Sequence, residues 1–561
     1  MSTLESGPAG PATPLPSPEQ PGKGADVIAD SNSTTNRVSR RAFLGGAAAA
    51  TVATTAAAIS APAGAQPRPV TEERRRAVVI GSGFGGAIAA LHLGRAGVDT
   101  VVLERGIRWP TGPNAETFPR MLSPDQRSAW LQPHPVMTGA PPAVFPPFTG
   151  LMERIPGNGM DILCGAGVGG GSLVYHGMTM QPNGENFAKC VSPRIDYEQM
   201  ASEYYPRVTR TLRIATIPDD LLNSPQYSSS RRFVEMADAQ GLHSFRVPMP
   251  IDWEFARREL RGEMRPSYTN GDVIYGVNNG GKFSVDVTYL AAAEATGKVE
   301  VAPLHRVNDI ERGADGTWIV HCDRIGRDGT VLERKRVVSD ALFLGAGSPG
   351  TTRLLVKARA KNAIPDLPDG VGTGWGNNGD RIFMVTRALD SPGAWQGGPA
   401  CVGVKDWDNP AGALTIVLGP VPFPLDLHTT SVIGYGVVEG LGSWHYDSAR
   451  DDAVLTWNQA YDRGLTDAIR ARIEQIVGAG FGVSAIDVNA FDTNTFHPLG
   501  GAPFETVCDD AGRVHGQRGL YILDGARIPG STGACNPSMT IAALAEYSMD
   551  LLVAHDVDTV F

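Results

Sequence analysis

The chain has 561 residues, of which 42% are hydrophobic and 19% charged, with a formal net charge of −10 at pH 7. This length and composition are typical of a folded protein with more than one large unit, and they exclude a disordered chain. The negative charge argues against a nucleic-acid partner, because phosphate binding needs a basic face. It is compatible with an uncharged substrate.

Residues 1–65 have the three parts of a cleaved export signal. A polar stretch is followed by Arg40-Arg41, an Ala/Thr-rich apolar run and Ala63-Gly64-Ala65. We expect a disordered leader with a twin-arginine signal peptide, hence a protein that is secreted or held in the cell envelope. The alternative is a chance arginine pair ahead of an Ala-rich linker. The remaining sequence contains no apolar run of about 18 residues, the length needed to span a bilayer.

The cysteines are scattered and form no CxxC pair, and no histidine has the spacing of a zinc ligand. We therefore expect no metal site and mostly buried free thiols. Export would permit a disulfide, but the spacing indicates none. The cysteines are Cys164, Cys190, Cys322, Cys401, Cys508 and Cys535.

A dinucleotide-binding fingerprint begins the next part of the chain. Residues 76–80 predict a buried parallel strand, residues 81–86 read GSGFGG, and an Ala/Leu-rich helix follows to residue 96. Gly81 permits the tight turn, Gly83 lets the backbone approach a pyrophosphate, and Gly86 lets the helix pack on the strand. A second predicted strand, residues 98–103, ends at Glu104, where a carboxylate can bind a ribose diol. These features suit NAD and FAD alike.

Three later segments extend the nucleotide-binding part of the chain. Residues 164–174 are glycine-dense, so the backbone there can lie against a flat or anionic group, although a mobile loop is the alternative. Residues 340–348 and 519–525 each predict a strand, the first leaving through a glycine turn and the second ending at Asp524. Strands so far apart in the chain must close one sheet, so the nucleotide-binding domain is discontinuous.

At these residues the chain resembles the glucose–methanol–choline (GMC) flavoenzyme family, and within it the bacterial cholesterol oxidases that bind FAD non-covalently. The resemblance rests on an ordered set of motifs: GSGFGGA at 81–87, CGAGVGGGSLV at 164–174, LFLGAGSPGTTRLL at 342–355, FHPLGG at 496–501 and LYILDGARIPGSTGACNPSMTIAALAE at 520–546. Shorter motifs between them, such as GWG at 374–376 with NG at 378–379, also match.

The resemblance implies an α/β fold with a discontinuous Rossmann-like FAD-binding domain and a mixed-sheet α+β substrate domain. The FAD-binding domain would comprise residues 71–108, 283–373 and 512–561. The substrate domain would comprise residues 109–282 and 374–511, with the flavin-contacting loop at 164–178. Carried over motif by motif, the cofactor-binding residues are Gly81, Gly83, Phe84, Gly85, Gly86, Glu104, Gly171, Met178, Val307 and Asp524.

The same resemblance places a His–Asn pair, His497 and Asn536, against the flavin ring. Alcohol oxidation needs such a pair, because a base must take the hydroxyl proton while hydride leaves the carbinol carbon. An asparagine can hold a developing oxyanion without titrating. A structural histidine is the alternative for His497. The loop before Asn536 is one residue longer than the family pattern.

Two positions depart from the family. Val417 stands where cholesterol oxidases have the glutamate that moves the double bond from Δ5 to Δ4, and a valine cannot move a proton. Glu439 could substitute only if the fold brought it near. Tyr175 and His176 replace an Asn-Gly pair that the family has near the flavin and the proposed oxygen route.

The sequence therefore predicts FAD-dependent oxidation of a sterol 3-hydroxyl or another small apolar alcohol, with O2 reduced to H2O2 and isomerisation doubtful. One alternative is a flavin dehydrogenase of another bulky alcohol that uses a different acceptor. Another is a flavin-bearing sterol-binding protein without turnover. We expect a monomer. The resemblance also implies a transient membrane-surface contact through the Pro-rich loop, if Phe145 and Phe148 are exposed at the cavity mouth. An ordinary surface connection is the alternative.

Overall fold

The computed structural model describes residues 70–137, 142–478 and 480–561. The predicted leader and signal peptide lie outside these residues. All six cysteines lie within them and are free thiols, five of them buried, which confirms that expectation. In the described part of the chain, no helix is both long and apolar enough to cross a membrane.

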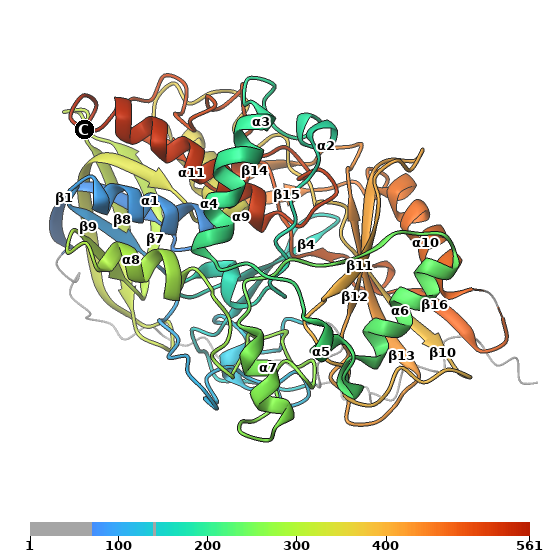
Figure 1. Cartoon of the computed structure of the whole chain (residues 1–561). Coiled ribbons are helices and arrows are strands. Elements are labelled where there is room, and N and C mark those ends of the chain that lie inside the picture. The colour runs from blue at the N-terminus through green and yellow to red at the C-terminus, as the bar shows by residue number, and fades with distance from the viewer. Residues whose placement is uncertain (1–69, 138–141, 479) are drawn as a thin grey trace, which may run out of the picture. The chain divides into compact units, whose positions relative to one another are not determined.

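A seven-stranded sheet carries the dinucleotide fingerprint (Figure 1). Its order is β6-β2-β1-β9-β8-β7, and β18 pairs with β9. The strands β6, β2, β1, β9 and β18 run parallel, whereas β7 and β8 form an antiparallel extension of β9. The strands are β1 (Val70–Ile80), β2 (Thr100–Leu103), β6 (Val299–Ala302), β7 (His305–Arg312), β8 (Trp318–Ile325), β9 (Val331–Leu344) and β18 (Leu520–Ile522).

The parallel strands are buried where they carry apolar residues, as strands covered on both faces require. In β1 the exposed, charged start gives way to Ala77–Ile80, whose side chains are all buried. Helix α1 (Phe84–Arg95) follows the GSGFGG turn and packs against α11 (Ser538–His555). Every strand of this sheet comes from the segments predicted for the FAD-binding domain, apart from Val70 at the start of β1. The predicted α/β fold class is confirmed.

A second sheet of six strands lies beside the first (Figure 1). All its pairings are antiparallel. The mixed pairing that the resemblance implies for the substrate domain occurs in the three-stranded sheet described below. The order is β16-β10-β13-β12-β11-β5, made of β5 (Ser244–Arg246), β10 (Arg381–Arg387), β11 (Val402–Asp406), β12 (Leu414–Gly419), β13 (Thr429–Gly436) and β16 (Val483–Asp487).

Helices α6 (Ser228–Ala239) and α10 (Arg463–Val477) pack against this sheet and share its core. A Cβ atom at Gly434 would lie 2.5 Å from the Ile469 side chain, so glycine in β13 lets α10 approach closely. The helix therefore covers one face of the sheet. The opposite face of β10 and β13 is left to line the cavity described below.

The remaining strands form two smaller sheets, and short helices connect the larger elements. A three-stranded sheet contains β3 (Met152–Ile155), β4 (Asp161–Gly165) and β17 (Asn494–Thr495), and a hairpin contains β14 (Ser443–Asp447) and β15 (Asp452–Thr456). The other helices are α2 (Gly184–Ala188), α3 (Tyr197–Gln199), α4 (Tyr205–Thr211), α5 (Asp219–Leu222), α7 (Trp253–Leu260), α8 (Ala291–Glu294) and α9 (Gly347–Ala360). Single turns of 3-10 or π-helix are η1 (Gln126–Ser128), η2 (Gly170–Leu173), η3 (Met200–Tyr204), η4 (Pro225–Tyr227), η5 (Asp286–Leu290), η6 (Val488–Ala490) and η7 (Gly525–Arg527).

Gly86 has the packing role that the sequence predicts for it. A Cβ atom at this position would lie 2.0 Å from the Gly81 carbonyl oxygen and 3.3 Å from the Val79 side chain. Moving the backbone of the turn or the buried strand would cost considerable free energy. Any side chain at Gly86 would therefore disrupt the packing of α1 on β1.

We predict that Gly86→Ala lowers the free energy of unfolding by about 3 kcal/mol or more, measured by urea denaturation. The matched control is Gly464→Ala near the start of α10, where an added Cβ meets no atom within 4 Å. That change should leave stability equal or raise it by up to about 1 kcal/mol. Equal stability of the two variants would contradict the prediction.

Candidate active site

One cavity of about 900 Å³ extends from the glycine turns of the seven-stranded sheet to the second sheet. This volume suits a bound dinucleotide or substrate-sized ligand. On one side lie the end of β1, the start of α1 and the end of β2. On the other lie residues of β10 and β13, Ile382, Met384, Ser431 and Ile433.

The two glycine-rich segments predicted from the sequence pack against each other and form one wall. The Ser82 Oγ donates to the Gly167 carbonyl at 3.3 Å and accepts from the Gly169 N–H at 3.1 Å. A Cβ atom at Gly170 would lie 2.9 Å from the Gly83 Cα. The second segment is therefore a fixed partner of the fingerprint turn and not a separate loop.

Glu104 joins these segments through its carboxylate. One oxygen accepts from the Ser82 N–H at 3.2 Å and from its Oγ at 2.6 Å. The other accepts from the Gly106 N–H at 2.9 Å and the Gly167 N–H at 3.3 Å. Glu104 also lines the cavity, so it both holds the glycine wall and remains where a ribose could bind it.

The start of α1 fits a pyrophosphate. No side chain caps the helix, so its first N–H groups are left for a ligand. Gly81 has a φ of +90°, and a Cβ there would lie 2.4 Å from the Gly345 carbonyl oxygen. At Gly83 an added Cβ meets nothing within 4 Å, so this residue faces open space in the cavity. Gly86 packs inside the protein and does not line the cavity.

The other predicted cofactor contacts line the same cavity: Phe84, Gly85, Gly171, Met178, Val307 and Asp524. The Asp524 carboxylate accepts from the Thr351 hydroxyl and from the Ala526 N–H at 2.9 Å. Burial raises the pKa of Asp524 to about 6 despite these bonds. A buried carboxyl with this pKa can hydrogen-bond a hydroxyl of a bound ligand in either protonation state.

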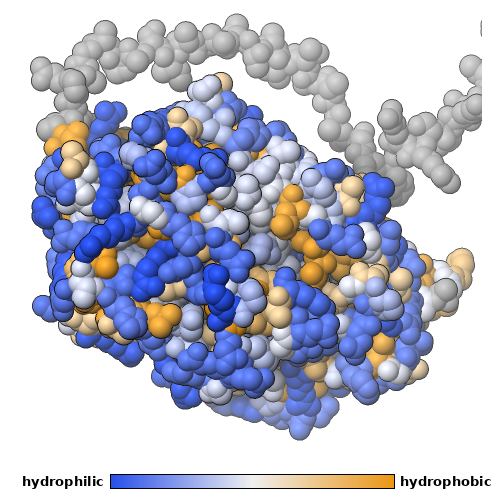
Figure 2. All heavy atoms as spheres, turned by 90° about the horizontal axis from the view of Figure 1, so that it is seen from above, coloured by the Kyte–Doolittle hydropathy of each residue, from blue (hydrophilic) through white to orange (hydrophobic). Residues whose placement is uncertain are grey.

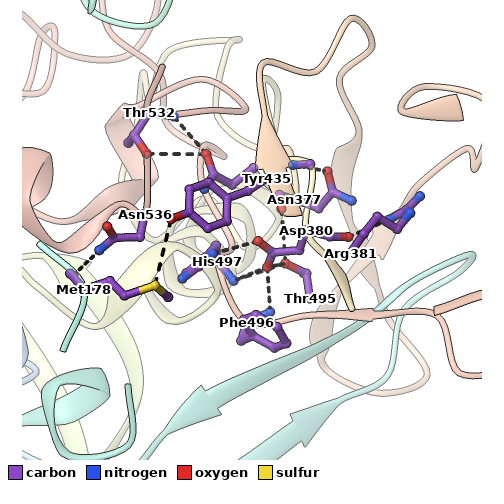
Figure 3. Close-up of polar contacts among 12 residues, drawn as sticks. Met178, Asn377, Asp380, Arg381, Tyr435, Thr495, Phe496, His497, Thr532 and Asn536 are labelled. Carbon is purple, nitrogen blue, oxygen red and sulfur yellow. Dashed lines mark hydrogen bonds and ion pairs between the residues drawn. The ribbon is translucent and has the colours of Figure 1, made fainter. Parts of the chain in front are cut away.

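His497 is held by a buried carboxylate that the sequence analysis missed (Figure 3). The ring Nδ1 lies 2.7 Å from an Asp380 oxygen, and Asp380 has 0% exposed side chain. The second Asp380 oxygen accepts from the Thr495 hydroxyl at 2.7 Å and from the backbone N–H groups of Phe496 and His497 at 3.2 and 3.0 Å. The signal in the sequence is the acidic residue directly after the Asn-Asn-Gly run at 377–379.

Asn536 lies in the cavity wall, but its amide groups are occupied. Its Oδ1 accepts from the Met180 N–H at 3.1 Å, and its Nδ2 donates to the Met178 carbonyl and to the Ser538 hydroxyl. Asn536 therefore clamps the segment that the family places against the flavin. In the preceding loop Ala534 has a φ of +59°.

The turn at residues 377–380 positions both members of the predicted pair. Asn378 accepts from the Thr532 N–H at 3.0 Å and donates to the Cys535 carbonyl at 2.9 Å, which fixes the loop leading to Asn536. Asp380, two residues later, fixes His497. Tyr435 lies between the two, with its ring edge-on to the His497 ring at 6.0 Å and its hydroxyl 3.9 Å from the Met178 sulfur (Figure 3).

Tyr175 and His176, the two departures from the family, also line the cavity. The buried Lys282 ammonium donates to the Tyr175 carbonyl and to the Leu173 carbonyl, and it lies 4.6 Å from the centre of the Tyr175 ring. Burial, the nearby Lys282 and His497 lower the pKa of His176 to about 4. Burial also lowers the pKa of Lys282 to about 7, against the opposing attraction of Asp286. His176 is thus neutral at neutral pH.

Neither candidate for the isomerisation step is placed to act. Val417 pairs with Ile433 across the antiparallel strands and so points to the same side of the sheet, but it is fully buried and does not line the cavity. Glu439 is exposed and does not line the cavity either. The fold thus does not bring Glu439 to the cavity, which was the condition for it to replace the missing glutamate.

The Pro-rich loop does not expose its two phenylalanine side chains fully. Phe145 and Phe148 were expected to be exposed at the cavity mouth, but both are partly buried against a cluster that includes Leu151 and Tyr275. The Phe145 N–H also donates to the Pro133 carbonyl, which holds the loop against the protein. A Pro-rich run indicates a surface loop but not which of its side chains turn inward.

The pKa of His176 makes stability depend on pH. Below about pH 6.5 the unfolded chain binds a proton at this histidine, whereas the folded protein does so only near pH 4. The unfolded state therefore gains relative stability as the pH falls through this window. We predict that the melting temperature of His176→Gln falls less than that of the parent protein between pH 6.5 and pH 4. Scanning calorimetry measures this fall. His134→Gln, which removes an exposed histidine, is the control, and parallel curves for all three proteins would contradict the prediction.

Comparisons with known proteins agree with this geometry. Residues 378–487 match the C-terminal domain model of the GMC oxidoreductases, and residues 458–545 match a second GMC oxidoreductase model. A cholesterol oxidase of Mycobacterium tuberculosis is 27% identical and aligns over 84% of this chain and 90% of its own length. A cholesterol oxidase of Acinetobacter baumannii is 23% identical over 85% of this chain and 94% of its own.

Among solved structures, the crystal structure of pyridoxine 4-oxidase from Mesorbium loti shares the fold. The TM-score is 0.59 at 14% sequence identity, with 86% of this chain and 99% of that chain covered. GMC oxidoreductases and cholesterol oxidases are FAD-dependent flavoproteins, and the glycine wall, Glu104 and the uncapped α1 fit this cofactor. The chain thus resembles the GMC oxidoreductases, and among them the cholesterol oxidases, and its cofactor is FAD.

Proposed function

We propose that this oxidoreductase converts the 3-hydroxyl of a sterol, or the hydroxyl of a similar bulky alcohol, to the ketone and passes the electrons to O2 as H2O2. One observation carries the proposal. His497, bound through Nδ1 to a buried carboxylate, lines a cavity that continues from the FAD-binding glycine wall into an apolar chamber. That arrangement provides a proton acceptor beside a site for an uncharged substrate.

The chemistry divides between cofactor and protein. Bound FAD supplies the acceptor for the hydride that leaves the carbinol carbon. His497 accepts the hydroxyl proton at Nε2, because its Nδ1 is bonded to Asp380. The O–H electron pair becomes the new C=O bond. Asn536 holds the Met178–Met180 segment in place, and the apolar walls exclude water from the reacting carbon.

The chamber wall supports an apolar substrate. The lining includes a large set of hydrophobic side chains: Met121, Met137, Ile155, Leu163, Val174, Ile274, Ile382, Met384, Val421, Phe423, Ile433 and Phe496. Such side chains bind a fused ring system through the hydrophobic effect.

No described carboxylate that lines the cavity is free to move a proton between C4 and C6 of a steroid. Glu153 is paired with Arg105, Asp452 with Arg353, and Asp451 with Lys361. Glu104 and Asp524 are bonded within the FAD-binding part. Because Val417 carries no proton, we propose oxidation without Δ5-to-Δ4 isomerisation.

The test is anaerobic addition of cholesterol to the yellow holoprotein, followed by air. We expect the flavin band to bleach, to return with stoichiometric H2O2, and the product to lack the strong ultraviolet absorbance of a conjugated enone. His497→Gln should slow bleaching by roughly 10²- to 10⁴-fold while still binding FAD, since a base contributes that much. Bleaching by other bulky alcohols alone would exclude the sterol. Return of colour only with an added dye would favour a dehydrogenase, and no bleaching by any alcohol would favour a binding protein.

A second prediction concerns the cofactor site. In Gly83→Ala the added methyl group enters the cavity without touching the protein, so stability of the apoprotein should stay within about 0.5 kcal/mol. The methyl group would occupy the space where the pyrophosphate meets the helix, so FAD affinity should fall at least tenfold, about 1.4 kcal/mol. Flavin fluorescence titration measures this. Gly112→Ala, also without contacts within 4 Å but away from the cavity, is the control and should bind FAD normally.

We also propose that the protein is exported by the twin-arginine route and contacts a membrane surface transiently. Arg40-Arg41 supports export. Leu389, Leu425 and Phe481 support the membrane contact, with 85%, 69% and 91% of each residue exposed. Their loops adjoin one another, and the second continues from residues 420–423 of the cavity wall. Elsewhere polar residues cover most of the face seen in Figure 2, where apolar residues gather only in small patches.

A further inference from the structure

Three histidines line the cavity, and two of them, His176 and His497, have opposite electrostatic surroundings. His497 has a carboxylate oxygen 2.7 Å from Nδ1. His176 has no hydrogen-bond partner at Nδ1, and its charged neighbours are Lys282 and His497 itself. A proton released in the cavity therefore meets one imidazole whose positive charge is compensated and one whose positive charge is opposed.

The hydrogen bonds of Asp380 fix which proton lies on His497. One carboxylate oxygen, Oδ2, accepts from the Thr495 hydroxyl and from two backbone N–H groups, at 2.7 to 3.2 Å, and the other, Oδ1, faces His497 Nδ1. The three donors fit an ionised carboxylate. An ionised carboxylate only accepts hydrogen bonds, so the proton in the bond at Oδ1 belongs to the imidazole Nδ1. The lone pair of neutral His497 is then on Nε2.

We propose that Asp380 is a positioning residue for the oxidation: it holds His497 in the Nδ1–H tautomer, with Nε2 as the proton acceptor for the substrate hydroxyl. This inference rests on the proposed alcohol oxidation and adds the group that makes His497 a base. In the step itself the substrate O–H bond breaks and its proton forms a bond to Nε2. The charge that then develops on the imidazole is balanced by Asp380, which keeps its own acceptor role throughout.

Burial makes this pairing effective. Asp380 has 0% and His497 13% exposed side chain, so water screens their attraction weakly. Arg381, the next residue in the chain, pairs with Asp462 at 2.7 Å. The Arg381 guanidinium donates to the Asp380 backbone carbonyl and not to its carboxylate. The Asp380 carboxylate is therefore not neutralised by Arg381, and its negative charge acts on His497.

A purely structural role is the competing explanation, because Asp380 also ties the backbone of residues 495–497. The chain offers a matched control. Thr495→Val removes a hydroxyl bond to the other oxygen of the same carboxylate but leaves the Asp380–His497 bond intact. If Asp380 only braced the loop, Asp380→Asn and Thr495→Val should have similar effects.

The experiment uses the holoprotein with each variant and the alcohol that bleaches the parent flavin. For Asp380→Asn we expect the limiting rate of anaerobic flavin reduction to fall by roughly 10²- to 10⁴-fold, with half-saturation by substrate changed less than about threefold. Thr495→Val should lose less than about tenfold. In a series of alcohols of rising hydroxyl acidity, the defect of Asp380→Asn should shrink, because a more acidic hydroxyl depends less on a base.

A second readout does not need turnover. Nitrogen NMR of ¹⁵N-histidine-labelled protein, with His497→Gln to assign the signal, reports which ring nitrogen carries the proton. We expect Nδ1–H in the parent protein and in Thr495→Val, and the Nε2–H tautomer or a mixture in Asp380→Asn. An Nε2–H signal in the parent protein would overturn the proposal even if Asp380→Asn fails to fold. Equal rate losses in the two variants would overturn it too. If no alcohol reduces the flavin while NMR shows Nδ1–H, the proposed function fails and the positioning by Asp380 stands.

Discussion

The turn at residues 377–380 is the constraint on which the catalytic side of the cavity depends. It brings together two segments of the chain that approach the cavity from different directions, the His497 segment and the loop before Asn536. Each is held by side chains of this one turn, through Asp380 and Asn378. The Asn378 and Asp380 side chains are fully buried, so their polar atoms need hydrogen-bond partners inside the protein. Among the described contacts, those partners all come from the two segments that the turn brings together. Asn378 adopts a φ of +54° to reach its partners, a conformation that asparagine tolerates better than most residues.

A comparable network holds the opposite wall. Glu104 bonds the fingerprint turn and the second glycine segment, and Ser82 bonds that segment again. The close approach of Gly170 to Gly83 leaves no room for side chains between them. The Met178–Met180 segment follows from this wall and is bonded at its other end by Asn536. The glycine wall and the His497 side of the cavity are thus linked through a short chain segment whose two ends are held by hydrogen bonds.

The local elements near the fingerprint were predictable because strong local signals determine them. Strand β1, helix α1 and Glu104 follow from a buried apolar run, a glycine turn and an Ala/Leu-rich run, and the structure places these elements as expected. Contacts between segments that lie far apart in the chain were harder to predict from the sequence. The antiparallel order of the second sheet, the inward turn of Phe145 and the distance of Glu439 from the cavity depend on tertiary packing that no local pattern encodes. Asp380 was visible only as an acidic residue after a glycine turn, and its partner His497 lies 117 residues further along the chain.

The contrast between His176 and His497 follows from what binding and oxidising an apolar alcohol require of the cavity. A chamber that binds a large hydrophobic substrate must be dry, and a dry chamber raises the free energy of any charge that forms in it. Oxidation of an alcohol nevertheless releases a proton there. The protein can accept it only where a compensating charge was placed in advance, and Asp380 provides this beside His497. Where no such charge exists, as at His176 beside Lys282, burial keeps the imidazole neutral. The same low polarity that selects the substrate therefore also selects which histidine can act as the base.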